Sequence, residues 1–173
     1  MAIRSYTSRR ELDEHDFHPA VTLLVPLGFI VLQALLPKPF PKLAILDLPL
    51  IATIFFAVSR RSPIAGTFTG AAIGLVQDAL TNQPIGVNGI TKAIIGYAAA
   101  SIGFKVDVDS ITTRAVMSFG FCLMQSVLLY LIERRLLGVS YQVLWLHELL
   151  RAVVNTVAAI PIFYVLDRTK IRE

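Results

Sequence analysis

Six predominantly apolar stretches alternate with short polar or basic segments along this chain. A helix that crosses a bilayer needs about 20 apolar residues, with a range of about 17–25. The stretches that approach this length are Ala20–Leu36, Leu43–Val58, Ile64–Leu80, Val87–Phe104, Ile111–Ile132 and Leu146–Leu166. Five of them are clear candidates for membrane spans. The pattern therefore predicts a bundle of about six transmembrane helices.

The second stretch is short and is interrupted by the sequence DLP. Asp47 can cap the start of a helix, and Pro49 can occupy its first turn. We therefore expect an interfacial piece followed by a short, steep helix. Whether this stretch spans the membrane decides between six spans and five.

Composition supports a membrane protein, because 55% of the 173 residues are hydrophobic and only 16% are charged. Soluble domains carry about a quarter charged residues. The formal charge of +4 does not indicate nucleic-acid binding, since the basic residues flank apolar runs as they do in polytopic proteins. The chain is thus expected to be an all-α integral membrane protein.

No catalytic or metal chemistry is predicted. The single cysteine, Cys122, lies in an apolar run, which excludes an internal disulfide and a thiolate metal site. The three histidines lack suitably placed carboxylates for a metal site. No phosphate-binding loop, serine elbow or nucleophilic cysteine pair is present. We expect no enzyme activity and no cofactor.

Basic residues suggest the topology, because cytoplasmic loops carry the excess of Lys and Arg. Six spans with a cytoplasmic N-terminus fit this rule, and five spans with an external N-terminus fit it almost as well. Both alternatives orient the last four spans identically, with TNQPIG facing outward. The predicted organisation is a cytoplasmic tail over 1–19, one transmembrane domain over 20–166, and a cytoplasmic tail over 167–173.

Small residues recur every fourth position in the third stretch, at Gly66, Gly70 and Gly74, and Asp78 continues the row. In lipid, helices associate by close packing, which small residues permit. The fourth stretch has a similar row of Lys92, Gly96, Ala100 and Phe104. The two stretches are therefore expected to form an antiparallel hairpin.

We expect Asp78 to face Lys92, Gly74 to face Gly96, and Gly70 to face Ala100. An ion pair between Asp78 and Lys92 would explain a carboxylate on a helix seam, because charges are costly inside a bilayer. The alternative is that Lys92 extends to the outer headgroups and Asp78 is hydrated at its helix end.

The last stretch begins with polar residues spaced by four, His147, Arg151 and Asn155. These side chains should face the bundle or a partner, and with Asp47 they are the candidate partner-binding or pocket residues. Three glutamines in separate stretches could join helices through amide hydrogen bonds. They are Gln33, Gln77 and Gln125.

The segment GLVQDALTNQPIGVNGITKAIIGY resembles the signature of the MreD family, a small inner-membrane subunit of the bacterial rod-shape machinery. The matching positions are Gly74, Leu75, Asp78, Pro84, Gly86, Gly96 and Tyr97. The resemblance implies a non-enzymatic scaffold in the bacterial inner membrane. It also implies binding to the bitopic protein MreC, and proximity to MreB filaments, RodA and a penicillin-binding transpeptidase. The long charged N-terminus departs from the family pattern.

The family fold also looks like the six-helix substrate-binding subunits of energy-coupling-factor transporters, which supplies the alternative function. In a vitamin-type importer subunit, Asp78, Lys92, Arg151 and Asn155 would line a pocket that opens outward. Such subunits usually carry alanines four apart in their first span, and Ala20–Leu36 lacks that row. The scaffold is therefore the favoured interpretation.

Overall fold

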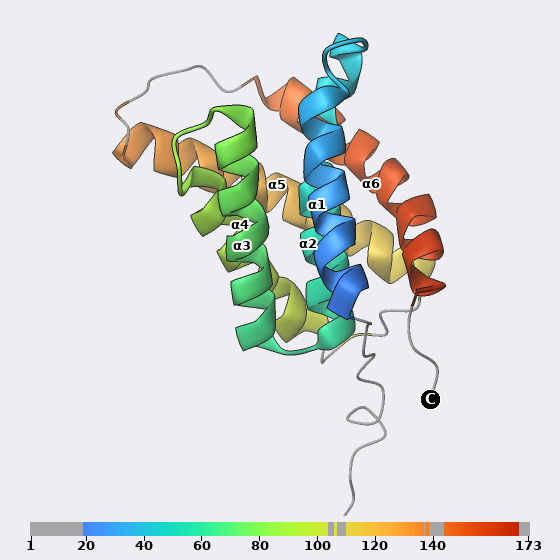
Figure 1. The fold of residues 1–173 in the computed structure, drawn as a ribbon. Coiled ribbons are helices and arrows are strands. Elements are labelled where there is room, and N and C mark those ends of the chain that lie inside the picture. The colour runs from blue at the N-terminus through green and yellow to red at the C-terminus, as the bar shows by residue number, and fades with distance from the viewer. Residues whose placement is uncertain (1–18, 104–105, 107–109, 137, 139–143, 170–173) are drawn as a thin grey trace, which may run out of the picture.

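The computed structural model describes residues 19–103, 106, 110–136, 138 and 144–169. Within these residues the chain forms six α-helices and one short 3-10 helix, so the expected all-helical fold is confirmed (Figure 1). In chain order they are α1 (Pro19–Leu35), η1 (Pro41–Ile45), α2 (Leu48–Arg60), α3 (Pro63–Thr81), α4 (Val87–Gly103), α5 (Ile111–Leu136) and α6 (Trp145–Asp167). The predicted tails at 1–18 and 170–173 lie outside the described residues.

The interruption predicted in the second stretch is confirmed. The turn η1 ends at Ile45, and Asp47 then caps α2 by accepting a hydrogen bond from the Leu50 amide at 3.0 Å. Pro49 occupies the first turn of α2. A backbone N–H at this position has no partner within the helix, so the absence of an N–H in proline costs no hydrogen bond. The helix thus starts inside an otherwise apolar run because a carboxylate satisfies its free amides.

Helix α2 forms the centre of the bundle. Twelve of its residues, Leu48 to Ser59, are buried. The other five helices contact it from around its circumference, α1 and α3 among them (Figure 1). In the window of Pro41–Arg60, 72% of the residues are buried, against 28% in α5 and in α6. The shortest predicted span is therefore the core of the protein.

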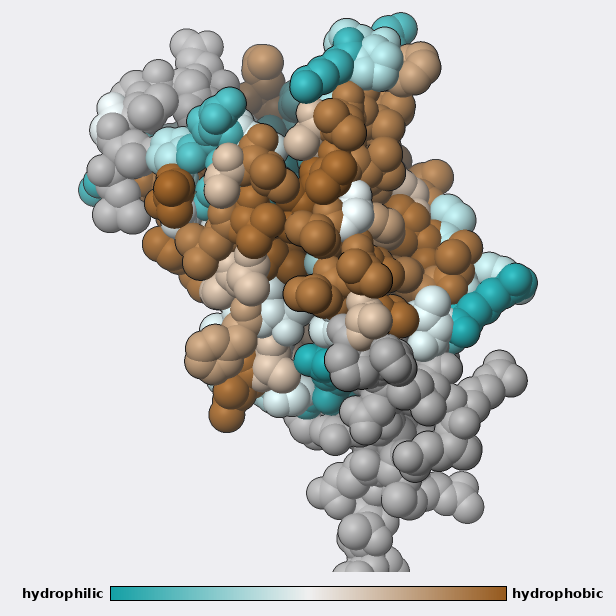
Figure 2. Space-filling model, in the orientation of Figure 1, coloured by the Kyte–Doolittle hydropathy of each residue, from teal (hydrophilic) through white to brown (hydrophobic). Residues whose placement is uncertain are grey.

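Among the described residues, three helical stretches are long and apolar enough to cross a membrane, namely Pro41–Arg60, Ile111–Arg135 and Trp145–Asp167. The apolar part of α1, Ala20–Leu35, is shorter. Large apolar side chains are exposed on the bundle, Leu23, Phe68 and Val157 among them. The face of the bundle seen in Figure 2 is largely apolar. The molecule is therefore a multi-pass membrane protein, and the spanning of α1, α3 and α4 stays a prediction.

The glycine row does form the seam between α3 and α4, but the predicted pairing is wrong by two helical turns. A Cβ on Gly66 would meet the Gly96 carbonyl oxygen, and one on Gly70 would overlap the Lys92 carbonyl oxygen. A Cβ on Gly74 would overlap the carbonyl oxygen of Asn88. Gly96 thus faces Gly66 rather than Gly74. The pairing shifts because Asp78 lies beside the first residues of α4, not beside Lys92.

Candidate functional site

Asp78 caps the helix that follows it. Its carboxylate accepts hydrogen bonds from the backbone amides of Gly86 at 2.9 Å, Asn88 at 3.1 Å and Gly89 at 3.3 Å. It also accepts one from the side-chain amide of Asn88 at 2.8 Å. The first amides of a helix lack internal partners, and their positive end favours an anion. The carboxylate at the end of the glycine row therefore joins α3 to the start of α4.

A turn of unusual backbone geometry makes this capping possible. Gly86 has a φ of +104°, which residues with a side chain rarely adopt. Its amide is thereby directed at the Asp78 carboxylate one residue before α4 begins. Pro84 lies exposed in the same turn. The motif residues Pro84 and Gly86 thus shape the loop that Asp78 closes.

The predicted ion pair between Asp78 and Lys92 is wrong, and so is the alternative that Lys92 extends to the headgroups. Lys92 is fully buried, and its Nζ lies 3.5 Å from the Asp47 carboxylate. The Asn88 side chain connects the two groups indirectly, since its Oδ1 accepts from Lys92 Nζ at 3.3 Å while its Nδ2 donates to Asp78. Asp78 is occupied by backbone amides, which leaves Asp47 as the anion for Lys92.

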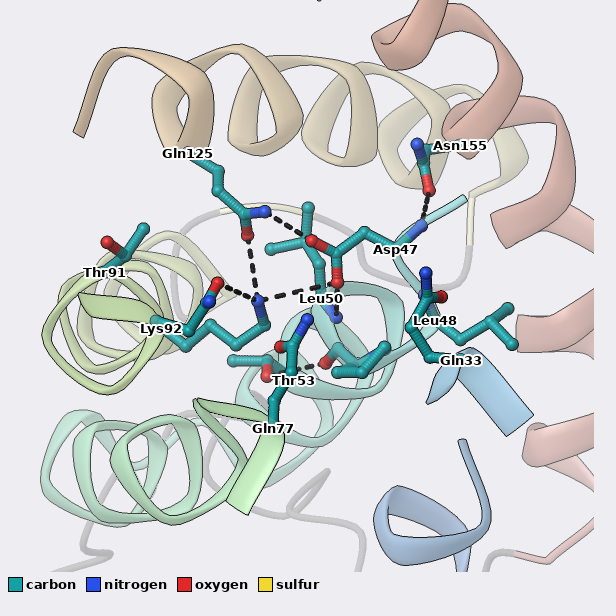
Figure 3. A network of polar contacts seen from close by, with 12 residues as sticks. Gln33, Asp47, Leu48, Leu50, Thr53, Gln77, Thr91, Lys92, Gln125 and Asn155 are labelled. Carbon is teal, nitrogen blue, oxygen red and sulfur yellow. Dashed lines mark hydrogen bonds and ion pairs between the residues drawn. The ribbon is translucent and has the colours of Figure 1, made fainter. Parts of the chain in front are cut away.

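The Asp47 carboxylate is the centre of a buried polar cluster (Figure 3). It receives Lys92 from α4, the side-chain amide of Gln125 from α5, and Arg151 Nη2 from α6 at 3.1 Å. Gln125 also accepts from Lys92 Nζ at 3.3 Å through its Oε1. One carboxylate thus connects the start of α2 to three other helices. We call Asp47, Lys92, Gln125, Arg151 and Asn155 the Asp47 cluster.

Two amide side chains hold the backbone around Asp47. Asn155 Oδ1 accepts from the Asp47 amide at 2.7 Å, and its Nδ2 donates to the Ile45 carbonyl at 2.9 Å. Gln33 of α1 accepts from the Leu48 amide at 3.2 Å. Buried amides and carbonyls need such partners in an apolar medium. Gln33 and Gln125 therefore join helices as predicted, whereas Gln77 Oε1 is buried and has no hydrogen bond within the described residues.

Polar contacts continue from Arg151 to the surface through Glu148 and His147, which we call the outer branch of the cluster. Arg151 Nη1 lies 3.7 Å from Glu148, whose carboxylate also accepts from Ser126 and lies 3.7 Å from His147 Nδ1. Arg151 and Asn155 face the bundle, as the spacing predicted, while His147 is exposed. Polar contacts therefore run from the exposed His147 to the buried Lys92.

The charges of this cluster and of the neighbouring Glu148 are balanced. Asp47 and Glu148 oppose Lys92 and Arg151, and each cation contacts a carboxylate. Among the residues that the structure describes, no group of three His, Cys, Asp or Glu side chains could hold a metal ion. What the arrangement can do is fix α2, α4, α5 and α6 relative to one another, because separating them would leave unpaired charges in an apolar medium.

A protein-family model, rod shape-determining protein MreD, matches residues 17–169. The chain belongs to the MreD family. No curated protein and no solved structure matches it. Family membership gives the chain a role in determining rod shape, and its helices make it a membrane protein. The expected likeness to energy-coupling-factor subunits stays a prediction.

The residues predicted to form an MreD signature do not gather at one place in the structure. Gly74, Asp78, Gly86 and Gly96 build the hairpin of α3 and α4, as described above. Leu75 and Tyr97 are exposed on the outside of that hairpin. The signature therefore combines residues that form the hairpin with residues that the fold leaves available to other molecules.

Neither the role of Asn88 nor the link from Asp47 to Lys92 was predicted from the sequence. Asn88 lies one turn before Lys92, so its contact with Lys92 was readable from helical spacing. The link between Asp47 and Lys92 joins residues 45 positions apart and has no local signal. The packing of α2 against α4 creates it.

Proposed function

We propose that this MreD protein is a non-enzymatic membrane scaffold of the rod-shape complex. It would bind an MreC-like bitopic protein and help to couple MreB filaments to RodA and its transpeptidase. One observation carries the proposal beyond family membership: the buried charges are engaged with one another. Asp47, Lys92 and Arg151 form ion pairs inside the protein. They serve to hold helices together.

The surface supports a scaffold as well. Hollows between neighbouring helices lie on the outside of the bundle and have apolar walls. One lies between α4 and α5, a second between α1 and α3, and a third between α1 and α6. Apolar faces with grooves suit lipid tails and the helices of other membrane proteins.

An importer subunit would require Asp78, Lys92, Arg151 and Asn155 to line a common pocket. Asp78 instead caps α4, and Asn155 holds the backbone on both sides of Leu46. These contacts use the polar atoms that a small ligand would have to reach. The contacts therefore favour the scaffold over the importer subunit.

The orientation we propose places both termini of the described chain in the cytoplasm. Arg60, at the end of α2, donates to Thr22 in the first turn of α1, so α1 begins where α2 ends. Arg114, at the start of α5, pairs with Asp167 at the end of α6. The start of α1 and the end of α6 thus lie at one end of the bundle. In the sequence Arg4, Arg9 and Arg10 precede α1, and Lys170 and Arg172 follow α6, and the positive-inside rule assigns such basic flanks to the cytoplasm of a bacterial inner membrane. This arrangement favours six spans over five.

Depletion followed by co-purification tests the function. Loss of the chain from a rod-shaped bacterium should give round cells, and the tagged chain in mild detergent should retain an MreC-like protein. Cells that stay rod-shaped would contradict the scaffold, and so would a purified chain that retains no MreC-like protein. Saturable binding of a vitamin to the purified chain would favour the importer instead.

A further inference from the structure

The exposed face of α4 carries Tyr97, whose hydroxyl group has no hydrogen-bond partner in the described part of the chain. Tyr97 is 57% exposed. The two other tyrosines that the structure describes differ, because Tyr130 accepts from Arg134 and Tyr164 accepts from Arg168. Tyr97 is thus the one of these three tyrosines whose polar end is unused.

The depth of Tyr97 follows from how α4 lies along α2. Lys92 contacts Asp47 at the start of α2, and Gly103 packs against Val58 near its end. Tyr97 lies about midway between Lys92 and Gly103 and hence beside the middle of α2. Because Pro41–Arg60 is apolar and long enough to span, we place the middle of α2, which belongs to this stretch, within the hydrocarbon. The Tyr97 hydroxyl is then at hydrocarbon depth.

Lipid cannot satisfy a hydroxyl group at that depth, because acyl tails offer neither donors nor acceptors. Tyrosines that meet lipid favour the headgroup level, where the hydroxyl is hydrated. The neighbouring residues on this side of α4 are apolar or small: Ile90, Ile94 and Ser101. We call these three residues and Tyr97 the Tyr97 face.

We propose that the Tyr97 face binds the transmembrane helix of a single-span partner, and that this helix offers a hydrogen-bond acceptor to the Tyr97 hydroxyl. This inference rests on the proposed scaffold function and names the surface that the MreC-like partner uses. A transmembrane helix is the occupant that can supply both a polar side chain at mid-bilayer depth and an apolar face for Ile90 and Ile94. Hydrogen bonds between helices and close packing are what hold helices together in lipid.

Photo-crosslinking from the native complex tests the surface directly. We would place p-benzoylphenylalanine at Tyr97, and separately at Phe68 on the exposed side of α3 as a control. The expected result is a crosslink from position 97 to the transmembrane segment of the MreC-like protein, with none from position 68. Adducts with lipid alone, a product of two copies of this chain, or a crosslink from position 68 instead would overturn the proposal.

The hydroxyl itself is tested by Tyr97→Phe. Recovery of the MreC-like protein should fall about three- to tenfold, the range expected for one hydrogen bond between membrane helices. The thermal stability of the isolated chain should not change, since no part of the described chain uses this hydroxyl. Tyr164→Phe is the matched control, because Tyr164 is also exposed but bonds Arg168, and it should leave recovery unchanged.

The outcomes separate the surface from the function. If the unsubstituted chain retains no MreC-like protein, the proposed function fails. If it does, and Tyr97→Phe retains as much as Tyr164→Phe, the function stands and the Tyr97 face is not the docking surface.

Discussion

Two regions hold this bundle together by opposite means. The Asp47 cluster joins four helices through long polar side chains that meet at one carboxylate. The seam between α3 and α4 joins two helices through residues without side chains, so that the backbone at Gly66, Gly70 and Gly74 contacts the backbone of α4. The cluster depends on charge balance, whereas the seam depends on volume. Substitutions should therefore affect the two regions through different physical causes.

The largest effect is expected at the cluster. Asp47→Ala leaves Lys92 and Arg151 without their shared carboxylate and should lower the free energy of unfolding by about 3–5 kcal/mol. Unfolding in detergent, followed by circular dichroism, measures it. The double change Asp47→Leu with Lys92→Met removes one charge of each sign and should be less harmful than Asp47→Ala. A loss for Asp47→Ala no greater than for a surface substitution would contradict the role of the cluster.

At the seam, Gly70→Ala places a methyl group against the Lys92 carbonyl oxygen. Because backbone cannot give way as a flexible side chain can, we expect a loss of about 1–3 kcal/mol. Gly28→Ala is the matched control, since a Cβ there meets nothing within 4 Å. It should be neutral or slightly stabilising, as alanine is the better helix former. Equal effects of the two changes would show that the seam is not closely packed.

The cap that connects the two regions should respond less. Asp78→Ala removes the acceptor for the first amides of α4 and should cost about 0.5–2 kcal/mol. Thermal unfolding of the purified chain provides the measurement. The exchange Asp78→Lys with Lys92→Asp should not restore stability, because these two residues are not an ion pair. If the exchange restored the thermal stability, it would support an ion pair between Asp78 and Lys92.

The smallest effect is expected at the exposed end of the outer branch. His147→Ala should change the free energy of unfolding by no more than about 0.5 kcal/mol, because His147 is exposed and lies 3.7 Å from Glu148. The same unfolding assay measures it beside Asp47→Ala. A loss of unfolding free energy as large as that of Asp47→Ala would contradict this expectation, because it would mean that the contacts of His147 stabilise the fold as much as those of Asp47.

Local chemistry made much of the fold predictable. The helix that starts at Asp47 was readable because a capping carboxylate followed by proline is a signal contained within a few residues. The glycine row was readable because helical spacing places residues four apart on one face. The choice of partner for Lys92 was not, since Asp47 and Asp78 are both carboxylates and only the packing of α2 decides which one is near.

An apolar helical membrane protein, the start of α2 at Asp47 and a small-residue seam between the third and fourth stretches were predictable without the fold, because these follow from composition, capping and periodicity along one chain. That Gly66 rather than Gly74 faces Gly96, that Asp78 caps α4 and that Lys92 pairs with Asp47 became known only from the packed helices. For Lys92 this is because a buried charge pairs with whichever opposite charge the assembled helices bring closest. That distance is a property of the whole bundle.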